Sequence, residues 1–190
     1  MRRQLPTAIV VFIAFSLLAG VVYPLVVTGI TQVAFGPKAD GSLVERDGAV
    51  VGSSLIGQAF EDPGYFHPRP SAAGDGYDAM ASSASNLGPS NPELLDAVAQ
   101  RKAEYREANG LGADERVPVE AITGSGSGLD PHISPADARL QARRVAEARG
   151  VSLDLVLGLV DEATEGRPLG IFGDPGVNVL ELNLALDERL

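Results

Sequence analysis

Cysteine is absent from this 190-residue sequence, and histidine occurs only twice. Without cysteine no disulfide can hold an exported domain together, so its stability must come from packing. The two histidines, His67 and His132, cannot form a typical transition-metal site unless carboxylates join them. We therefore predict neither a metal site nor a disulfide framework.

Lysine is almost as scarce, and this weakens a phosphate-binding interpretation of the most unusual segment. Residues 123–135 read TGSGSGLDPHISP, with three alternating glycines. No Gly-Lys-Ser/Thr follows them, because the only lysines are Lys38 and Lys102, and Leu129 stands where a G-x-G-x-x-G pattern needs glycine. A nest of backbone amides that binds an anion remains an open alternative here.

Charge of either sign is missing from Leu5 to Phe35. This run exceeds the roughly 20 apolar residues that cross a bilayer, and it is too long for the apolar part of a cleaved signal peptide, the alternative. Arg2 and Arg3 precede it, which places the N-terminus in the cytoplasm and the remainder outside. The sequence predicts a transmembrane anchor over 1–36 and a soluble extracytoplasmic domain over 37–190.

Three residues inside the run bear on its packing. Ser16 and Gly20 form a small-xxx-small pair, which allows another helix to approach closely. Pro24 is expected to bend the helix without ending it.

The rest of the chain is acidic. All 25 acidic residues and 13 of the 15 basic ones follow the apolar run, so this part has a formal charge of −12. Such a body is a poor binder of nucleic acid or of anionic membranes. The charge favours solubility, and attraction of cations is the alternative.

Alternating helix and strand signals predict an α/β domain of α+β type. Capping residues and proline or glycine punctuation predict three helices, and short apolar runs predict two strands. The expected helices cover 92–109, 135–149 and 153–164, and the expected strands cover 50–56 and 177–186, the second with a bulge. Residues 36–48 are expected to form a linker, and 72–91 a long functional or mobile loop.

Asp130, His132 and Ser134 suggest a catalytic triad, but we favour a structural role. Partners this close in sequence rarely reach triad geometry, and the serines of the glycine-rich segment do not complete a G-x-S-x-G elbow. Ser134 is instead expected to cap the helix that follows. Arg69, fixed between two prolines, is expected to pair with a carboxylate or to contact a partner.

Five motifs in order then resemble a known family. They are Leu55-Ile56-Gly57-Gln58, Tyr65-Phe66-x-x-Arg69-Pro70-Ser71, Ser85-Asn86-Leu87-Gly88-Pro89-Ser90-Asn91, Ser127-Gly128-Leu129-Asp130-Pro131-His132-Ile133-Ser134 and Val177-Asn178-Val179-Leu180-x-Leu182-Asn183. With the single N-terminal span they resemble the KdpC family, accessory subunits of the bacterial high-affinity potassium-transporting ATPase. Ile171 and Phe172 lengthen one loop relative to that pattern.

The resemblance implies a non-catalytic, single-pass subunit in the bacterial inner membrane. Its implied partners are a channel-like potassium subunit, a P-type ATPase subunit, a small single-span subunit and membrane lipid. Implied roles are assembly and a raised ATP affinity of the ATPase subunit. Candidate assembly residues are Ser16, Gly20, Pro24, Tyr65, Phe66, Arg69, Asn86, Asp130, His132, Asn178 and Asn183.

Direct nucleotide binding is the alternative function, and ATP is then the ligand. Its candidate residues are Gln58, Ser125, Ser127 and Gly128. An external body conflicts with this alternative, because ATP lies inside the cell. A membrane-anchored exported hydrolase is a third and more distant alternative, since no nucleophile is assembled in the sequence.

Overall fold

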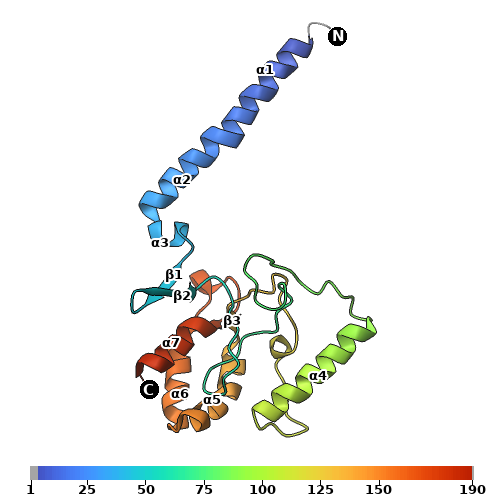
Figure 1. The fold of residues 1–190 in the computed structure, drawn as a ribbon, viewed down its shortest axis with the longest axis vertical. Coiled ribbons are helices and arrows are strands. Elements are labelled where there is room, and N and C mark those ends of the chain that lie inside the picture. The colour runs from blue at the N-terminus through green and yellow to red at the C-terminus, as the bar shows by residue number, and fades with distance from the viewer. Residues whose placement is uncertain (1–3, 190) are drawn as a thin grey trace. The chain divides into compact units, whose positions relative to one another are not determined.

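The computed structural model describes residues 4–189 and divides into two compact units (Figure 1). The first ends at Ser53 and the second begins at Ser54. The second unit mixes helices with a small antiparallel sheet, which confirms the predicted mixed class. Arg2 and Arg3, which set the predicted orientation, lie outside the described residues.

The first unit begins with one apolar helix, Gln4–Ala34, that is long enough to span a membrane. It consists of α1 (Gln4–Leu17), a π-helical turn (Leu18–Val22) and α2 (Tyr23–Ala34). The helix continues through Pro24, as expected. The wider turn ends two residues before Pro24, whose missing N–H and bulky ring disturb the regular pattern of backbone hydrogen bonds.

A hairpin completes this unit after the short helix α3 (Gly36–Ala39). Strands β1 (Leu43–Arg46) and β2 (Ala49–Ser53) are antiparallel, with Leu43 opposite Ser53. The predicted strand is thus present as β2, but the expected linker wrongly included β1. Asp47 and Gly48 both have positive φ, 53° and 77°, which suits a two-residue hairpin turn.

The second unit contains helices α4 to α7 and a three-stranded sheet in the order β3-β5-β4. Its elements are α4 (Pro92–Ala108), η2 (Val119–Ala121), β3 (His132–Ile133), α5 (Pro135–Arg149), α6 (Leu153–Glu162), β4 (Thr164–Glu165), η3 (Pro168–Gly170), β5 (Gly176–Asn178) and α7 (Val179–Arg189). The three predicted helices are confirmed as α4, α5 and α6.

Helix boundaries follow the capping signals of the sequence. The side chains of Asn91, Ser134 and Ser152 accept N–H groups at the starts of α4, α5 and α6. Gly150 ends α5 in the left-handed conformation at φ 67°. Because these signals are local, they were readable without tertiary information.

The predicted strand 177–186 is wrong beyond its first residues. Only Gly176–Asn178 is extended, and α7 starts at Val179. The Asn178 side chain accepts the Glu181 N–H at 3.2 Å and so acts as a cap. Val179, Leu182, Asn183 and Leu186 are all buried and follow the i, i+3, i+4, i+7 spacing of a helix face.

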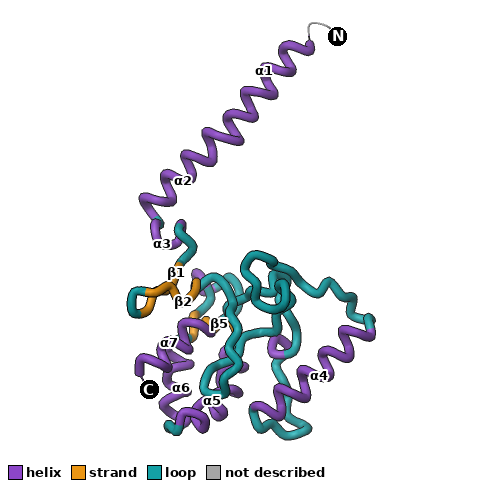
Figure 2. The backbone as a smooth tube through the Cα atoms, in the orientation of Figure 1, coloured by secondary structure: helices purple, strands orange, loops and turns teal. Residues whose placement is uncertain are grey.

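The core lies between α5, α6 and α7 and includes Phe66 from an irregular segment. Its fully buried large side chains include Val145, Val156, Val160, Leu182 and Leu186. Figure 2 shows that the chain between β2 and α4 runs as loop across this unit. The path of that loop positions most of the predicted site residues.

Candidate functional site

The extended segment Tyr65–Ser71 is held by amide side chains instead of a neighbouring strand. Asn183 of α7 accepts the Phe66 N–H at 2.8 Å and donates to the Phe66 carbonyl at 3.0 Å. Gln141 of α5 accepts the His67 N–H at 2.7 Å and donates to the His67 carbonyl at 3.1 Å. Both amides are 1% exposed, so each replaces the bonding of a strand partner in a dry environment.

Arg144 of α5 fixes the start of the same segment. Its guanidinium donates to the carbonyls of Pro63 and Tyr65, at 2.7 and 2.9 Å. It also donates to Gln141 Oε1 at 2.9 Å and to Asn109 Oδ1 at 3.1 Å. Arg144 therefore connects the segment to α5 and to the C-terminal end of α4.

A second arginine supports Tyr65. Arg149 lies 4.7 Å from the centre of the Tyr65 ring and donates to the Gly64 carbonyl at 2.6 Å. It pairs with Asp187 of α7 at 2.8 Å, and the Tyr65 hydroxyl donates to the same carboxylate at 3.1 Å. These contacts place Tyr65 in the structural framework of the unit.

A buried carboxylate closes this network at the start of α5. Asp137 is 1% exposed and accepts hydrogen bonds from the Tyr105 hydroxyl and from Gln141 Nε2. Burial raises the pKa of Asp137 to about 6 and raises the pKa of Tyr105 as well. Burial and then the charge of Arg144 lower the pKa of His67.

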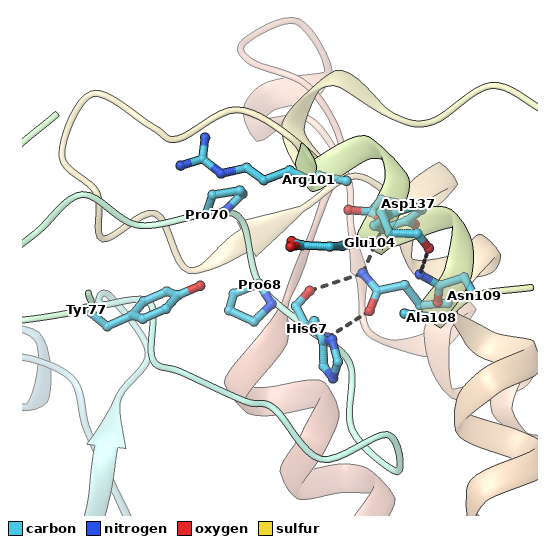
Figure 3. A pocket seen from close by; sticks show the side chains of 12 residues that line it. His67, Pro68, Pro70, Tyr77, Arg101, Glu104, Ala108, Asn109 and Asp137 are labelled. Atoms are coloured by element: carbon cyan, nitrogen blue, oxygen red, sulfur yellow. Dashed lines mark hydrogen bonds between the residues drawn. The ribbon is translucent and has the colours of Figure 1, made fainter. Parts of the chain in front are cut away.

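His67, Asp137 and Gln141 line a cavity of about 250 Å³, together with Tyr105 (Figure 3). Its walls include Pro68, Pro70 and Tyr77 on one side and residues of α4 and α5 on the other. Tyr77 donates to the Arg69 carbonyl at 2.7 Å, and burial raises its pKa to about 12. The cavity is thus formed by the same contacts that hold the extended segment.

Arg69, Asp130 and His132 come together in a second cluster, in which Asp130 is the carboxylate that pairs with Arg69. Arg69 Nη1 donates to Asp130 Oδ2 at 2.8 Å, and Asp130 Oδ1 accepts the His132 N–H at 3.0 Å. The hydrogen bond with the His132 side chain, then the backbone bond and Arg69, hold the pKa of Asp130 at about 2 despite burial, which opposes them. Asp130 raises the pKa of His132 in turn.

Ser134 does not complete a triad with this pair. Its hydroxyl accepts the Asp137 N–H at 3.1 Å and caps α5, the role that the sequence predicted. The arrangement is that of an ion pair that joins two loops, with His132 39% exposed beside it.

Tight backbone contacts join the loops around Asp130. Gly57 N–H donates to the Leu129 carbonyl at 2.8 Å, and a Cβ at Gly57 would lie 2.7 Å from the Asp130 carbonyl. Gly128 has φ 68°, and a Cβ there would lie 2.5 Å from the Ser83 carbonyl. Asn178 lies opposite His132 in the sheet, and its Nδ2 donates to the Ser54 carbonyl at 2.7 Å.

Three of the four candidate nucleotide residues lie together, because the hydroxyls of Ser125 and Ser127 are 3.3 Å apart and Gly128 follows them, whereas Gln58 lies on another loop. Ser125 lines a cavity of about 330 Å³ that also includes Asn86 and Arg101. Ser127 also accepts the Leu129 N–H at 3.1 Å, and the Gly128 N–H donates to the Ser125 carbonyl at 3.3 Å. Gln58 follows the Gly57 contact and is half-buried.

The remaining candidates occupy surfaces. Asn86 is exposed, has φ 54° and donates to the Ala84 carbonyl at 3.1 Å. Ser16, Gly20 and Pro24 are exposed on the apolar helix.

Sequence reasoning missed Asp137, Gln141, Arg144 and Tyr105 as parts of the site. The spacing of Asp137, Gln141 and Arg144 at i, i+4 and i+7 on one helix face was the available signal. Their partners lie 32 to 81 residues away in sequence, however, so the pattern alone could not identify them.

Comparison with known proteins gives a consistent family. The family model described as "K+-transporting ATPase, c chain" matches residues 5–188. The potassium-transporting ATPase KdpC subunit of Mycobacterium tuberculosis is 58% identical over 187 residues, covering 98% of this chain and 99% of the relative. The KdpC subunit of Rhodospirillum rubrum is 58% identical over 189 residues, covering 100% and 97%, and that of Koribacter versatilis is 49% identical over 188 residues, covering 98% and 95%. The chain therefore belongs to the KdpC family of K+-transporting ATPase subunits.

Proposed function

We propose that this chain is a non-catalytic accessory subunit that assembles and stabilises a K+-transporting ATPase from outside the cell membrane. The main support for this proposal is the family match over residues 5–188, which covers all but the first residue of the apolar helix Gln4–Ala34. The partners are the channel-like subunit, the P-type ATPase subunit and the small single-span subunit. A raised ATP affinity of the ATPase subunit belongs to the same proposal, as a consequence of assembly.

The geometry separates two kinds of candidate assembly residue. Phe66, Asn178 and Asn183 are buried, so they act by holding the extended segment and the loops in place. His132, Asn86 and the apolar helix are accessible and can touch a partner directly. The proposal therefore predicts that partner contacts come from the accessible group.

Gly20 offers a clean test of contacts within the membrane. A Cβ at Gly20 has nothing within 4 Å in this chain, and the same holds for Gly29 on the same helix. Gly20→Leu therefore leaves the chain itself undisturbed, but it blocks close approach of a neighbouring helix.

The experiment is co-purification of tagged full-length chain with the other subunits. Gly20→Leu is expected to reduce their yield severalfold, and Gly29→Leu, the matched control, is expected to leave it unchanged. A chain whose helix 4–34 is replaced by an unrelated apolar span should lose the complex. Recovery of the complex with that replaced span at the original yield would overturn the assembly role of the helix.

Direct nucleotide binding is the second candidate, and one observation favours it. Ser125, Asn86 and Arg101 share a cavity of about 330 Å³, within the size range of small-molecule sites, and Arg101 supplies a cation. Arg101 already donates to the Ile122 carbonyl at 3.4 Å, however, and an external body has no access to cytoplasmic ATP.

Calorimetric titration of the full chain with ATP decides this alternative. Heat beyond dilution that disappears in Arg101→Gln but persists in Arg106→Gln would support a nucleotide site. Absence of heat at millimolar ATP would end the nucleotide proposal and leave the assembly proposal intact.

A further inference from the structure

Three large apolar side chains are exposed on one loop of the second unit. The loop joins β4 to β5 and carries Leu169, Ile171 and Phe172, which are 87%, 72% and 58% exposed. Single exposed apolar residues are ordinary on protein surfaces, but three within four residues form a patch. No contact described above uses this loop.

The backbone of the loop holds these side chains outward. Leu169 has φ 54° and ψ 16°, a left-handed conformation that is costly for a leucine. The turn is closed by the Gly170 N–H, which donates to the Arg167 carbonyl at 2.8 Å, and by an ion pair of Arg167 with Asp174 at 2.8 Å. A leucine kept in a strained conformation while exposed indicates that its display has a use.

The length of the connection to the apolar helix indicates what can cover the patch. The hairpin returns on itself, with Leu43 opposite Ser53, so only residues 35–42 separate the helix end from the hairpin base. Eight residues span at most about 30 Å when fully extended. If the helix spans a bilayer, the second unit stays close to that bilayer, and tethering raises its effective concentration at the lipid surface.

We propose that Leu169, Ile171 and Phe172 insert into the boundary between headgroups and acyl chains of the bilayer that the chain's own helix crosses. The tip of the loop suits lipid because Leu169, Ile171 and Phe172 are its exposed apolar side chains. The polar groups of the connection lie at its base, where Glu165 and Asp174 line a separate cavity of about 500 Å³ with Arg69, Asp130 and His132. The one basic group of the loop, Arg167, is paired with Asp174. The net charge of −12 that follows the apolar run then selects a zwitterionic surface over an anionic one.

The chain contains no tryptophan, so one introduced indole reports on this loop alone. Full-length Phe172→Trp is reconstituted in phosphatidylcholine vesicles, with and without brominated acyl chains. We expect emission at short wavelength, strong quenching by bromine and a depth of about 5–10 Å into the boundary. The matched control is Val119→Trp, on an exposed residue of η2 that is 69% accessible, and it should emit as in water with little quenching.

Two additional samples sharpen the test. Ile171→Ser in the Phe172→Trp chain should reduce quenching, because it removes one inserted side chain without disturbing the core. Replacing half of the phosphatidylcholine with phosphatidylglycerol should also reduce quenching, because the acidic body is repelled.

Quenching of Phe172→Trp no greater than that of Val119→Trp would overturn the proposal. So would a wavelength shift that appears only with the other ATPase subunits and without bromine quenching, since the patch would then lie in a protein pocket. Stronger quenching in phosphatidylglycerol would contradict the charge argument. Far-ultraviolet circular dichroism of each variant establishes that it is folded.

Discussion

The segment Tyr65–Ser71 and helix α4 show opposite combinations of regular secondary structure and burial. The segment has no regular secondary structure, yet Phe66 is fully buried and buried amides bond its backbone. Helix α4 has 17 residues of regular structure, yet none of them is buried, and Figure 1 shows its N-terminal end projecting away from α5–α7. Regular hydrogen bonding and firm attachment to the core are therefore separate properties in this domain.

The attachments of α4 lie toward its C-terminal end. Tyr105 donates to Asp137, and Asn109 at the C-cap bonds Arg144. The N-terminal half instead exposes Leu95, at 55%. We infer that α4 opens locally before the domain unfolds, whereas the segment is released only when the core itself unfolds.

The largest predicted effect is on the segment. Asn183→Leu keeps similar volume but leaves the Phe66 N–H and carbonyl unpaired in a buried site. The expected loss of unfolding free energy is about 2–5 kcal/mol. Chemical denaturation of the full chain in detergent, followed by circular dichroism, measures it.

The matched control for this substitution is on α4. Gln100→Leu removes an exposed bond to Glu104 and is expected to change stability by less than about 0.5 kcal/mol. Equal losses for the two variants would show that the segment is held no more firmly than the helix.

The second prediction concerns the junction of the two regions at Asp137. Its folded pKa, about 6, exceeds the ordinary value of 3.8, so the folded state binds the proton more tightly. Its ionisation in the folded state therefore costs stability at neutral pH, and acidification from pH 7 to 4 recovers about 2 kcal/mol from this group. Asp137→Asn should abolish that gain.

The measurement is the difference in unfolding free energy between the original chain and Asp137→Asn at several pH values. The difference isolates Asp137 because other groups titrate alike in both. The pKa of His67 is lowered in the folded state and that of Asp130 is about 2, so protonation of either group on acidification destabilises the fold. In one chain alone, these losses would mask the gain from Asp137. A difference that is independent of pH would contradict the prediction.

The smallest predicted effect is on the start of α4. Asn91→Ala removes the side-chain bond to the Glu93 N–H at 2.9 Å, worth about 1 kcal/mol to the helix. Because this end is unburied, hydrogen exchange should accelerate in residues 93–97 while α5 is unchanged. Acceleration throughout α5 would show that the two regions unfold together.

The comparison also explains what the sequence could and could not reveal. The starts of α4, α5 and α6 were predictable, because Asn91, Ser134 and Ser152 act on residues beside them. The strand predicted over 177–186 failed because Val179, Leu182, Asn183 and Leu186 fit a helix that the alternation of Val177 and Val179 obscured.

The motif residues of the site could be identified from the sequence, but most of the long-range contacts between them could not. Arg69 was expected to pair with a carboxylate, and Asp130 is that partner, 61 residues away. The amide bonds from Gln141 and Asn183 span 74 and 117 residues, and no local pattern reports such pairings. Long-range satisfaction of backbone groups was therefore visible only in the folded chain.

The side of the membrane on which the second unit lies is central to the proposed function. The chain has no cysteine, so Ala113→Cys introduces a single thiol at an exposed position. Intact and opened cells carrying this variant are treated with a membrane-impermeant thiol reagent. An external second unit is expected to give equal labelling in both. Labelling only after opening would place the unit inside, contradict the external assembly role and restore the nucleotide alternative.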